Sequence, residues 1–213
     1  MAANPKPLLC YVTDRTQLTP GEALETRIRA AIAAGVDWIQ VREKDLPALS
    51  LARLVSDALE ATRAANAAAR ISVNDRLDVS LACGAHGVHL GGESMPAQEV
   101  VAWARCHAPR EFSIGLSCHS LAEAKRAHAA GAHYIFLGPI FATPSKAQFG
   151  PPLGLGKLRE VVSALEIPVF AIGGITPENA RECIAAGARG IAAIRLFQSE
   201  NIAATAAALR SAS

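Results

Sequence analysis

The sequence lacks the marks of several large protein classes. The formal net charge of its 213 residues is only +2 at pH 7, and no run of Lys or Arg occurs, so neither nucleic acid nor an acidic membrane is an expected partner. No apolar run reaches the length of a membrane span, and residues 1–7 contain no apolar core of a signal peptide. We therefore expect a soluble, cytoplasmic protein.

Cysteine pairs and a nucleotide-binding glycine loop are also missing. The five cysteines are an odd number and include no C-x-x-C pair, which predicts small buried side chains in a reducing compartment. Cys118 falls in a candidate site segment, where a structural role is still expected ahead of a reactive one. Residues 154–157 are too short for a Walker loop and lack its glycine spacing.

What the chain does contain is a repeated turn of small residues followed by an apolar run. Apolar residues make up 51% of the sequence and charged residues 19%, which is typical of a globular enzyme and fits a single domain over residues 1–213. Four such segments begin at Ala34, Cys83, Ala130 and Ala186. Their first glycines lie 49, 47 and 56 residues apart, about the length of two βα units.

Strand candidates occupy both the repeats and the gaps between them. Those in the gaps cover residues 8–12, 71–74, 112–116 and 169–172. Helical patterns cover residues 20–34, 47–69, 96–107, 120–130, 157–165, 177–186 and 202–209. Eight strand candidates that alternate with helices favour an α/β fold, a closed (β/α)8 TIM barrel, with an open doubly wound sheet as the alternative.

The stretch from Gln40 to Lys44 indicates the chemistry. On an extended strand, Gln40, Arg42 and Lys44 would share one face, with Val41 and Glu43 on the other. Two cations on one face repel each other and are costly to desolvate unless they meet an anion. We interpret this stretch as the floor of an anion site, with phosphate as the expected anion.

Other polar residues follow the predicted strands just as regularly, at the end of a barrel where active sites lie. They are Thr13, Asp14, Asn74, Asp75, Arg76, His89, Glu93, Ser94, Ser117, His119, Thr143, Ser145, Lys146 and Arg195. Gly173-Gly174, followed by a helix start at Thr176-Pro177, predicts a phosphate cradle, with a plain tight turn as the alternative.

The acidic and imidazole candidates are less specific. Asp75 could bind Mg²⁺ together with substrate phosphates, and an N-cap or a surface pair with Arg76 is an equal alternative. His86 and His89 should face opposite ways on a strand, which argues against a shared metal. His119 is a lone histidine that could transfer a proton or lie beside a helix N-cap.

At these residues the chain resembles the thiamine phosphate synthase family and its TenI-type thiazole tautomerase relatives over nearly its whole length. The motifs are Gln40-Val41-Arg42-Glu43-Lys44, Val73-Asn74-Asp75-Arg76, Gly87-Val88-His89-Leu90-Gly91, Gly138-Pro139-Ile140-Phe141 with Thr143, Ser145 and Lys146, and Ile172-Gly173-Gly174-Ile175. The resemblance implies small phosphorylated substrates: the first motif holds a pyrimidine pyrophosphate, Asp75 binds Mg²⁺, and the last motif holds thiazole phosphate. It also implies substrate contacts from Asn74, His89, Ser117, Thr143, Ser145 and Lys146.

Two positions depart from the family's pattern. Synthases usually have a second Mg²⁺-binding aspartate where this chain has Ser94, a poor ligand for a hard cation, and this leaves open whether Mg²⁺ binds and whether Glu93 replaces the missing ligand. The last strand usually ends in a serine-containing phosphate segment, but here it reads Ala193-Ile194-Arg195-Leu196. Arg195 would contact phosphate directly instead.

The resemblance leaves two activities open. In a synthase, Arg42, Lys44, Lys146 and Mg²⁺ on Asp75 would stabilise pyrophosphate as it leaves a hydroxymethylpyrimidine, and the thiazole nitrogen would attack the resulting cation. In a tautomerase, His119 would move a proton on a carboxythiazole phosphate without a metal. We place the synthase first and a non-catalytic phosphate-ligand sensor third. The sequence leaves open whether the chain forms a homo-oligomer.

Overall fold

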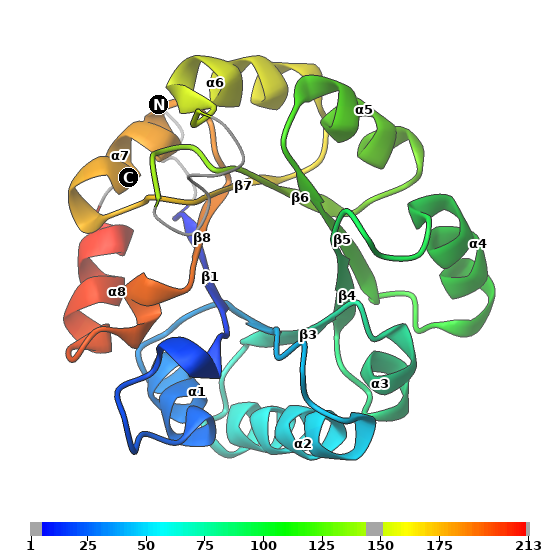
Figure 1. The fold of residues 1–213 in the computed structure, drawn as a ribbon, viewed down its shortest axis with the longest axis vertical. Helices are drawn as coiled ribbons and strands as arrows, with labels where there is room; N and C mark the ends of the chain where they lie inside the picture. Colours follow the sequence, from blue (N-terminus) through cyan, green and yellow to red (C-terminus); the bar gives the residue numbers. More distant parts are fainter. Residues whose placement is uncertain (1–5, 144–150, 212–213) are drawn as a thin grey trace.

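The structure is a computed structural model that describes residues 6–143 and 151–211. Within them, parallel strands β1 to β8 close into a barrel in chain order, and the helices form an outer ring (Figure 1). β1 pairs with β2 on one side and with β8 on the other, so that Cys10 lies opposite both Trp38 and Ala192. The predicted TIM barrel is confirmed, and the open doubly wound sheet is wrong because no edge strand remains.

The strands are short and the helices fill the connections between them. The strands are β1 Leu8–Val12, β2 Trp38–Val41, β3 Arg70–Asn74, β4 Gly87–Leu90, β5 Ser113–Cys118, β6 Tyr134–Leu137, β7 Val169–Ile172 and β8 Gly190–Ala193. The α-helices are α1 Leu24–Ala33, α2 Ala48–Ala64, α3 Leu77–Ala82, α4 Ala97–His107, α5 Leu121–Ala129, α6 Gly154–Ala164, α7 Pro177–Ala185 and α8 Ile202–Arg210. The 3₁₀ helices η1 Arg15–Gln17 and η3 Arg195–Gln198 follow β1 and β8. Of the described helices, none is both long and apolar enough to cross a membrane.

Four helices differ from the sequence prediction: α6 begins at Gly154, before its predicted start at residue 157, so that residues 154–157 lie in a helix, and three others differ for local reasons. α1 begins at Leu24, four residues late, because Gly21 in the preceding turn has a φ of 87°, outside the helical range. α2 ends at Ala64, and the alanines that follow lead into β3, because Asn66 adopts a left-handed φ of 48°. α3 was not predicted because six residues are too few to show a helical period.

The barrel interior is filled by aromatic side chains set against very small residues. Trp38 and Phe170 pack against Tyr134 with ring centroids 4.6 and 5.8 Å away. Tyr134 fits because β5 presents Gly115 to it, where an added Cβ would lie 2.1 Å from the ring. The opposite faces of the strands pack branched apolar residues against the helices. The barrel is therefore a packed core, which leaves the face where the strands end to bind ligands.

The small-residue repeats tie neighbouring strands together at the opposite face. In three of the four repeats, the side chain just before an even-numbered strand accepts a hydrogen bond from a backbone N–H of the preceding odd-numbered strand. The acceptors and donors are Asp37 Oδ2 with Leu9, His86 Nδ1 with Ile71, and His133 Nδ1 with Ile114, at 2.7, 2.9 and 3.0 Å. His86 is thus used in the fold, while His89 lies inside the barrel, so the two do not share a metal site.

These two histidines predict a pH-dependent stability. Burial lowers the pKa of both His86 and His133, and each ring must be neutral to accept its N–H. A lowered folded pKa means that the unfolded chain binds more protons, so this stabilisation is complete above about pH 6.5 and is lost as the pH falls. We expect the free energy of unfolding, measured with urea, to fall between about pH 7 and about pH 5.

The control is a double variant, His86→Leu with His133→Leu. It should be less stable than the natural chain at neutral pH but show a shallower pH dependence. Buried His89 is unchanged in both proteins, so the difference between the two slopes isolates the two histidines. An equally steep dependence in the double variant would contradict their role.

Candidate functional site

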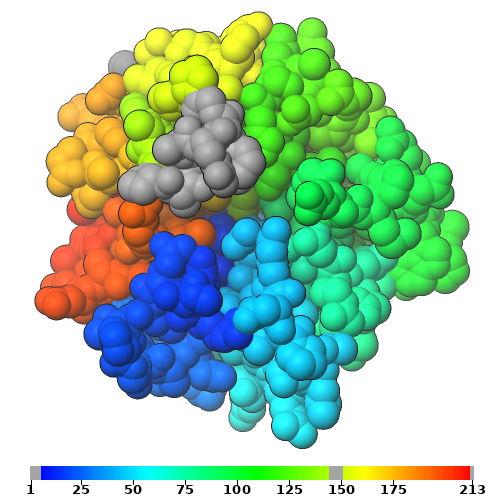
Figure 2. Space-filling view, viewed as in Figure 1, coloured from blue at the N-terminus to red at the C-terminus, as the bar shows by residue number. Residues whose placement is uncertain are grey.

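Most of the predicted site residues gather where the strands end. Figure 2 shows this face, with the segment after β1 in blue beside the segment after β2 in light blue. Hydrogen bonds from Arg15 to Glu43 and Asp45 join these two segments. The predicted site residues Ser145 and Lys146 lie outside the described residues.

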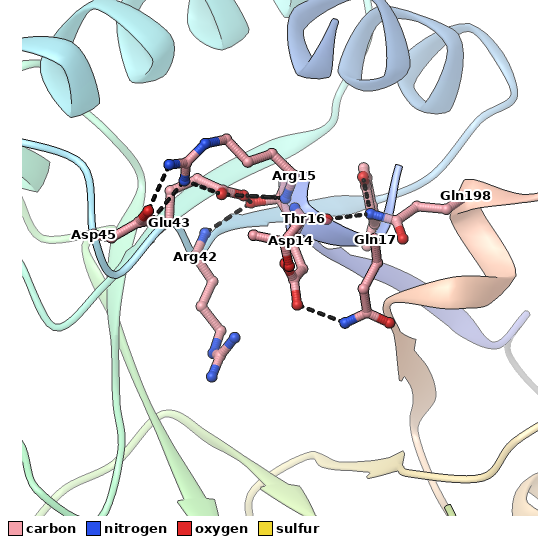
Figure 3. A network of polar contacts seen from close by, with 10 residues as sticks. Asp14, Arg15, Thr16, Gln17, Arg42, Glu43, Asp45 and Gln198 are labelled. Carbon is pink, nitrogen blue, oxygen red and sulfur yellow. Dashed lines mark hydrogen bonds and ion pairs between the residues drawn. The ribbon is translucent and has the colours of Figure 1, made fainter. Parts of the chain in front are cut away.

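The polar side chains at the end of β2 differ in burial and in direction. Gln40 is 2% exposed and points into the barrel. Arg42, just past the strand, is half-buried, and Figure 3 shows its guanidinium pointing away from Glu43 and Arg15. Because β2 ends at Val41, the predicted alternation does not extend to Lys44, which lies exposed in a turn. Neither Arg42 nor Lys44 forms an ion pair with a described residue.

No role for Glu43 was predicted from the sequence, yet its carboxylate organises this side of the site. Its side chain is only 2% exposed and accepts hydrogen bonds from Thr13 Oγ1 at 2.7 Å and from Arg15 Nη1 at 3.0 Å. Thr13 Oγ1 in turn accepts the Arg42 backbone N–H at 2.9 Å, and Arg15 also binds both carboxylate oxygens of Asp45 at 2.6 Å. Arg15 is therefore the counter-ion of Glu43, and Arg42 is not needed for that purpose (Figure 3).

A line of polar side chains crosses from β2 to the loop after β4. Gln40 Nε2 donates to Asn74 Oδ1 at 3.0 Å, and Asn74 Nδ2 donates to Asp75 Oδ2 at 2.6 Å. The Ser94 hydroxyl donates to Asp75 Oδ1 from the other side. Gln40 Oε1 is buried and has no partner among the described residues. The line thus ends in one fixed carboxylate and contains one buried acceptor without a partner among the described residues.

The backbone at Asp75 is strained, which separates it from an ordinary surface residue. Its φ is 61°, a left-handed conformation that costs a non-glycine residue about 1 kcal/mol or more, and such strain clusters at functional sites. The two alternatives for Asp75 were an N-cap role and a surface pair with Arg76. Neither is found, because Arg76 occupies the N-cap position of α3 without a side-chain cap, and its guanidinium pairs with Asp78. The strained conformation instead presents the carboxylate to Ser94 and Asn74.

This donor set can be compared with the needs of a metal. No group of three or more His, Cys, Asp or Glu side chains within the described residues could hold a metal ion. Mg²⁺ often binds proteins through one or two carboxylates and takes its other ligands from water and substrate phosphate. Asp75, with a hydroxyl and an amide beside it, fits such an ion only when phosphate is also present.

His89 lies beneath the mouth and is not exposed to it. It is 1% exposed, with Nδ1 3.2 Å from the Tyr134 hydroxyl and Nε2 3.0 Å from Ser117 Oγ. Burial lowers the pKa of His89 to about 3, so the ring is neutral at pH 7. Arg42 and Asp75 act on this pKa in opposite directions, so both charges lie within electrostatic reach of the ring. His89 and Ser117 were both predicted to contact substrate. Of these two residues, only half-buried Ser117 can meet a ligand directly.

His119 is exposed after β5 and its ring is held in one tautomer. Its Nδ1 hydrogen-bonds to the Gly138 carbonyl, which can only accept, so Nδ1 carries the proton. The neutral ring therefore presents Nε2 as a base. The backbone N–H of His119 donates to Glu123 Oε2 at 2.7 Å, which anchors the residue at the start of α5.

The glycines after β7 allow close packing and leave backbone N–H groups without an acceptor among the described residues. A Cβ on Gly174 would lie 2.5 Å from the Ala142 carbonyl oxygen, so the close approach of the loop after β6 requires glycine there. Among the described residues, neither the Gly173 nor the Gly174 N–H has an acceptor. Nearby, Arg195 Nη2 donates to Thr143 Oγ1 at 2.8 Å. Open amides beside a guanidinium suit a phosphate group.

Comparison with known proteins gives a consistent result. The family model described as thiamine monophosphate synthase matches residues 9–197. The chain is 42% identical to a thiamine-phosphate synthase of Moorella thermoacetica, over 94% of this chain and 93% of the relative, and 44% identical to one of Methanoculleus marisnigri, over 95% and 93%. A solved structure of thiamine phosphate pyrophosphorylase from Pyrococcus furiosus matches with a TM-score of 0.83 at 35% identity and covers 96% of this chain and 94% of that one.

The buried carboxylate of Glu43 makes a prediction about stability. Glu43→Ala leaves the buried Thr13 hydroxyl without its acceptor, which should cost about 1–3 kcal/mol of unfolding free energy. Asp45→Ala removes the exposed partner of the same arginine and should cost clearly less, because water screens that pair. Urea denaturation of both variants tests this. Equal losses would show that burial of Glu43 has no special importance.

Proposed function

The chain belongs to the thiamine monophosphate synthase family, and we propose that it joins a hydroxymethylpyrimidine pyrophosphate to a thiazole phosphate with release of pyrophosphate. One observation carries this proposal. Arg42 forms no ion pair with a described residue, although the Asp14 carboxylate lies within its electrostatic reach, and Arg42 and the strained Asp75 both act on buried His89 beneath the same barrel mouth. A cation without an ion pair and a fixed carboxylate at one mouth suit a polyphosphate with its metal.

The proposed reaction requires charge stabilisation and little proton transfer. The bond between the pyrimidine methylene carbon and the pyrophosphate oxygen breaks, and its electron pair leaves with pyrophosphate. The thiazole nitrogen then donates its lone pair to the methylene carbon, which forms the new C–N bond and a thiazolium cation. Arg42 stabilises the leaving group because it meets the growing negative charge from a half-buried position, and exposed Lys44 adds only a solvent-screened positive charge.

Two further features support the placement of the substrates. Gln40 Oε1, buried and without a partner among the described residues, can accept a hydrogen bond from an amino group of the pyrimidine. The open N–H groups of Gly173 and Gly174, with Arg195 beside them, can hold the phosphate of the thiazole. In this proposal the two substrates bind at different strand ends of one mouth, the pyrimidine at β2 and the thiazole phosphate after β7.

Asp75 would hold Mg²⁺ in this proposal, with Ser94 and Asn74 orienting its carboxylate. When bound, the ion neutralises charge on the departing pyrophosphate. We also propose a cytoplasmic location, because all five cysteines are free, as is usual for proteins of a reducing compartment.

The isomerase alternative rests on one residue. His119 has an accessible Nε2 in a fixed tautomer, which suits proton transfer on a carboxythiazole phosphate. That activity needs neither Arg42 nor the line of hydrogen bonds from Gln40 to Asp75, so it explains less of the site.

A coupling assay tests the proposal. The chain should make thiamine phosphate from the two substrates with Mg²⁺ and lose most of this activity without it. Arg42→Ala should lower kcat/KM by about 100-fold, since it removes one charge from the leaving-group site. Arg53→Ala, on the exposed surface of α2, is the matched control and should have no effect.

Two outcomes would reject the synthase. One is that no thiamine phosphate forms with or without Mg²⁺. The other is that Arg42→Ala and Arg53→Ala are equally active. Isomerisation of carboxythiazole phosphate that disappears in His119→Ala would then support the alternative.

A further inference from the structure

A threonine side chain extends the pairing of β1 with β2 beyond the last residue of β1. In this ladder Val12 lies opposite Gln40, and the next residue, Thr13, donates its backbone N–H to the Gln40 carbonyl at 2.9 Å. A regular parallel ladder would then direct the Arg42 N–H to the Thr13 carbonyl. The Arg42 N–H instead donates to the Thr13 hydroxyl oxygen, Oγ1, at 2.9 Å. The hydroxyl therefore takes the place of a backbone carbonyl at the end of the sheet.

This replacement lets the two chains separate at the mouth of the barrel. After Thr13 the first chain turns into η1, whose N-cap residue is Asp14, while the second chain passes through Arg42 toward the turn before α2. The Thr13 carbonyl belongs to the peptide unit that turns away, whereas its hydroxyl is carried on the side chain and still reaches β2. The Arg42 amide is thus held one residue beyond Val41, the last residue of β2.

The Glu43 carboxylate fixes the role of the Thr13 hydroxyl. Thr13 Oγ1 lies 2.7 Å from Glu43 Oε1, and a carboxylate can only accept, so the hydroxyl proton is directed to Glu43. The lone pairs of the same oxygen are left for the Arg42 N–H. Glu43 is held in turn, because it is buried and also accepts the backbone N–H and the guanidinium of Arg15. Thr13 is completely buried, so water does not compete for either bond.

We propose that Thr13 is a positioning residue for the pyrophosphate site and acts through the backbone of Arg42. Thr13 is too buried to meet a ligand, but its hydroxyl holds the Arg42 amide, and Figure 3 shows the guanidinium of Arg42 pointing away from Glu43 and Arg15. The buried hydrogen bonds of Thr13 fix where this side chain starts before the anion arrives, so less ordering remains when the anion binds. The choice of ligand rests on the proposed function, whereas the placement of the Arg42 backbone does not.

Hydrogen exchange of the Arg42 amide tests the placement without any substrate. Thr13→Val keeps the branched shape of the side chain but removes the acceptor, and Thr13→Ser keeps the acceptor. Thr62→Val in α2 is the matched control, because it removes another buried threonine hydroxyl, which donates to the Leu59 carbonyl at 2.8 Å. We expect the Arg42 amide to exchange about tenfold faster in Thr13→Val than in Thr62→Val, and Thr13→Ser to resemble the natural chain. Equal exchange in the two valine variants would overturn the proposal.

Calorimetry with inorganic pyrophosphate and Mg²⁺ tests the effect on the ligand. Thr13→Val should weaken binding about fivefold, because Arg42 then occupies its binding position only about one-fifth of the time. Thr13→Ser should bind as tightly as the natural chain, and Thr62→Val should leave binding unchanged. In the Arg42→Ala background, Thr13→Val should have no further effect on binding, although it still lowers the free energy of unfolding.

The outcomes separate this proposal from the proposed function. Binding that is unchanged in Thr13→Val, or that is weakened equally with and without the Arg42 side chain, would reject the positioning role and leave Thr13 with a structural role alone. If hydrogen exchange and pyrophosphate binding both follow the expected pattern while no thiamine phosphate is formed, the proposed reaction fails and the positioning role of Thr13 stands.

Discussion

The buried carboxylate of Glu43 is the interaction on which the mouth of the barrel depends. It lies between the ends of β1 and β2, where it accepts hydrogen bonds from Thr13 and Arg15. Because Arg15 neutralises Glu43, and Thr13 fixes the backbone of Arg42, the Arg42 guanidinium forms no ion pair within the described part of the chain and has only the Asp14 carboxylate within electrostatic reach on this side of the mouth. The buried Glu43 carboxylate is thus neutralised by Arg15, and the positive charge of Arg42 remains available for an anionic ligand.

Below the mouth, the same strands change from polar to aromatic side chains over a few residues. Tyr134 occupies the space left by Gly115, and its hydroxyl joins the packed interior to His89 and so to the site. This arrangement makes the core part of the site, because the polar atoms inside the barrel must pair with one another in a dry environment. Their pairing extends to half-buried Ser117 at the edge of the site.

Much of this architecture follows from the sequence. The repeated small-residue turns predict the barrel, and strand ends that meet at one face bring Gln40, Asn74 and Asp75 together. Three features do not follow. Lys44 leaves the predicted face because β2 ends at Val41, and the burial of Glu43 depends on Thr13 and Arg15, thirty and twenty-eight residues away. The link from Tyr134 to His89 spans 45 residues and is set by packing, which a local sequence pattern does not record.

The central claim is that Arg42 and Asp75 together bind pyrophosphate with its metal. A crystal structure of the protein with Mg²⁺ and inorganic pyrophosphate tests this most directly. We predict phosphate oxygens on the Arg42 guanidinium and the metal ion on the Asp75 carboxylate, with Glu43 still bound to Arg15. Pyrophosphate bound away from both residues, or Arg42 paired with a carboxylate of the protein, would contradict the account.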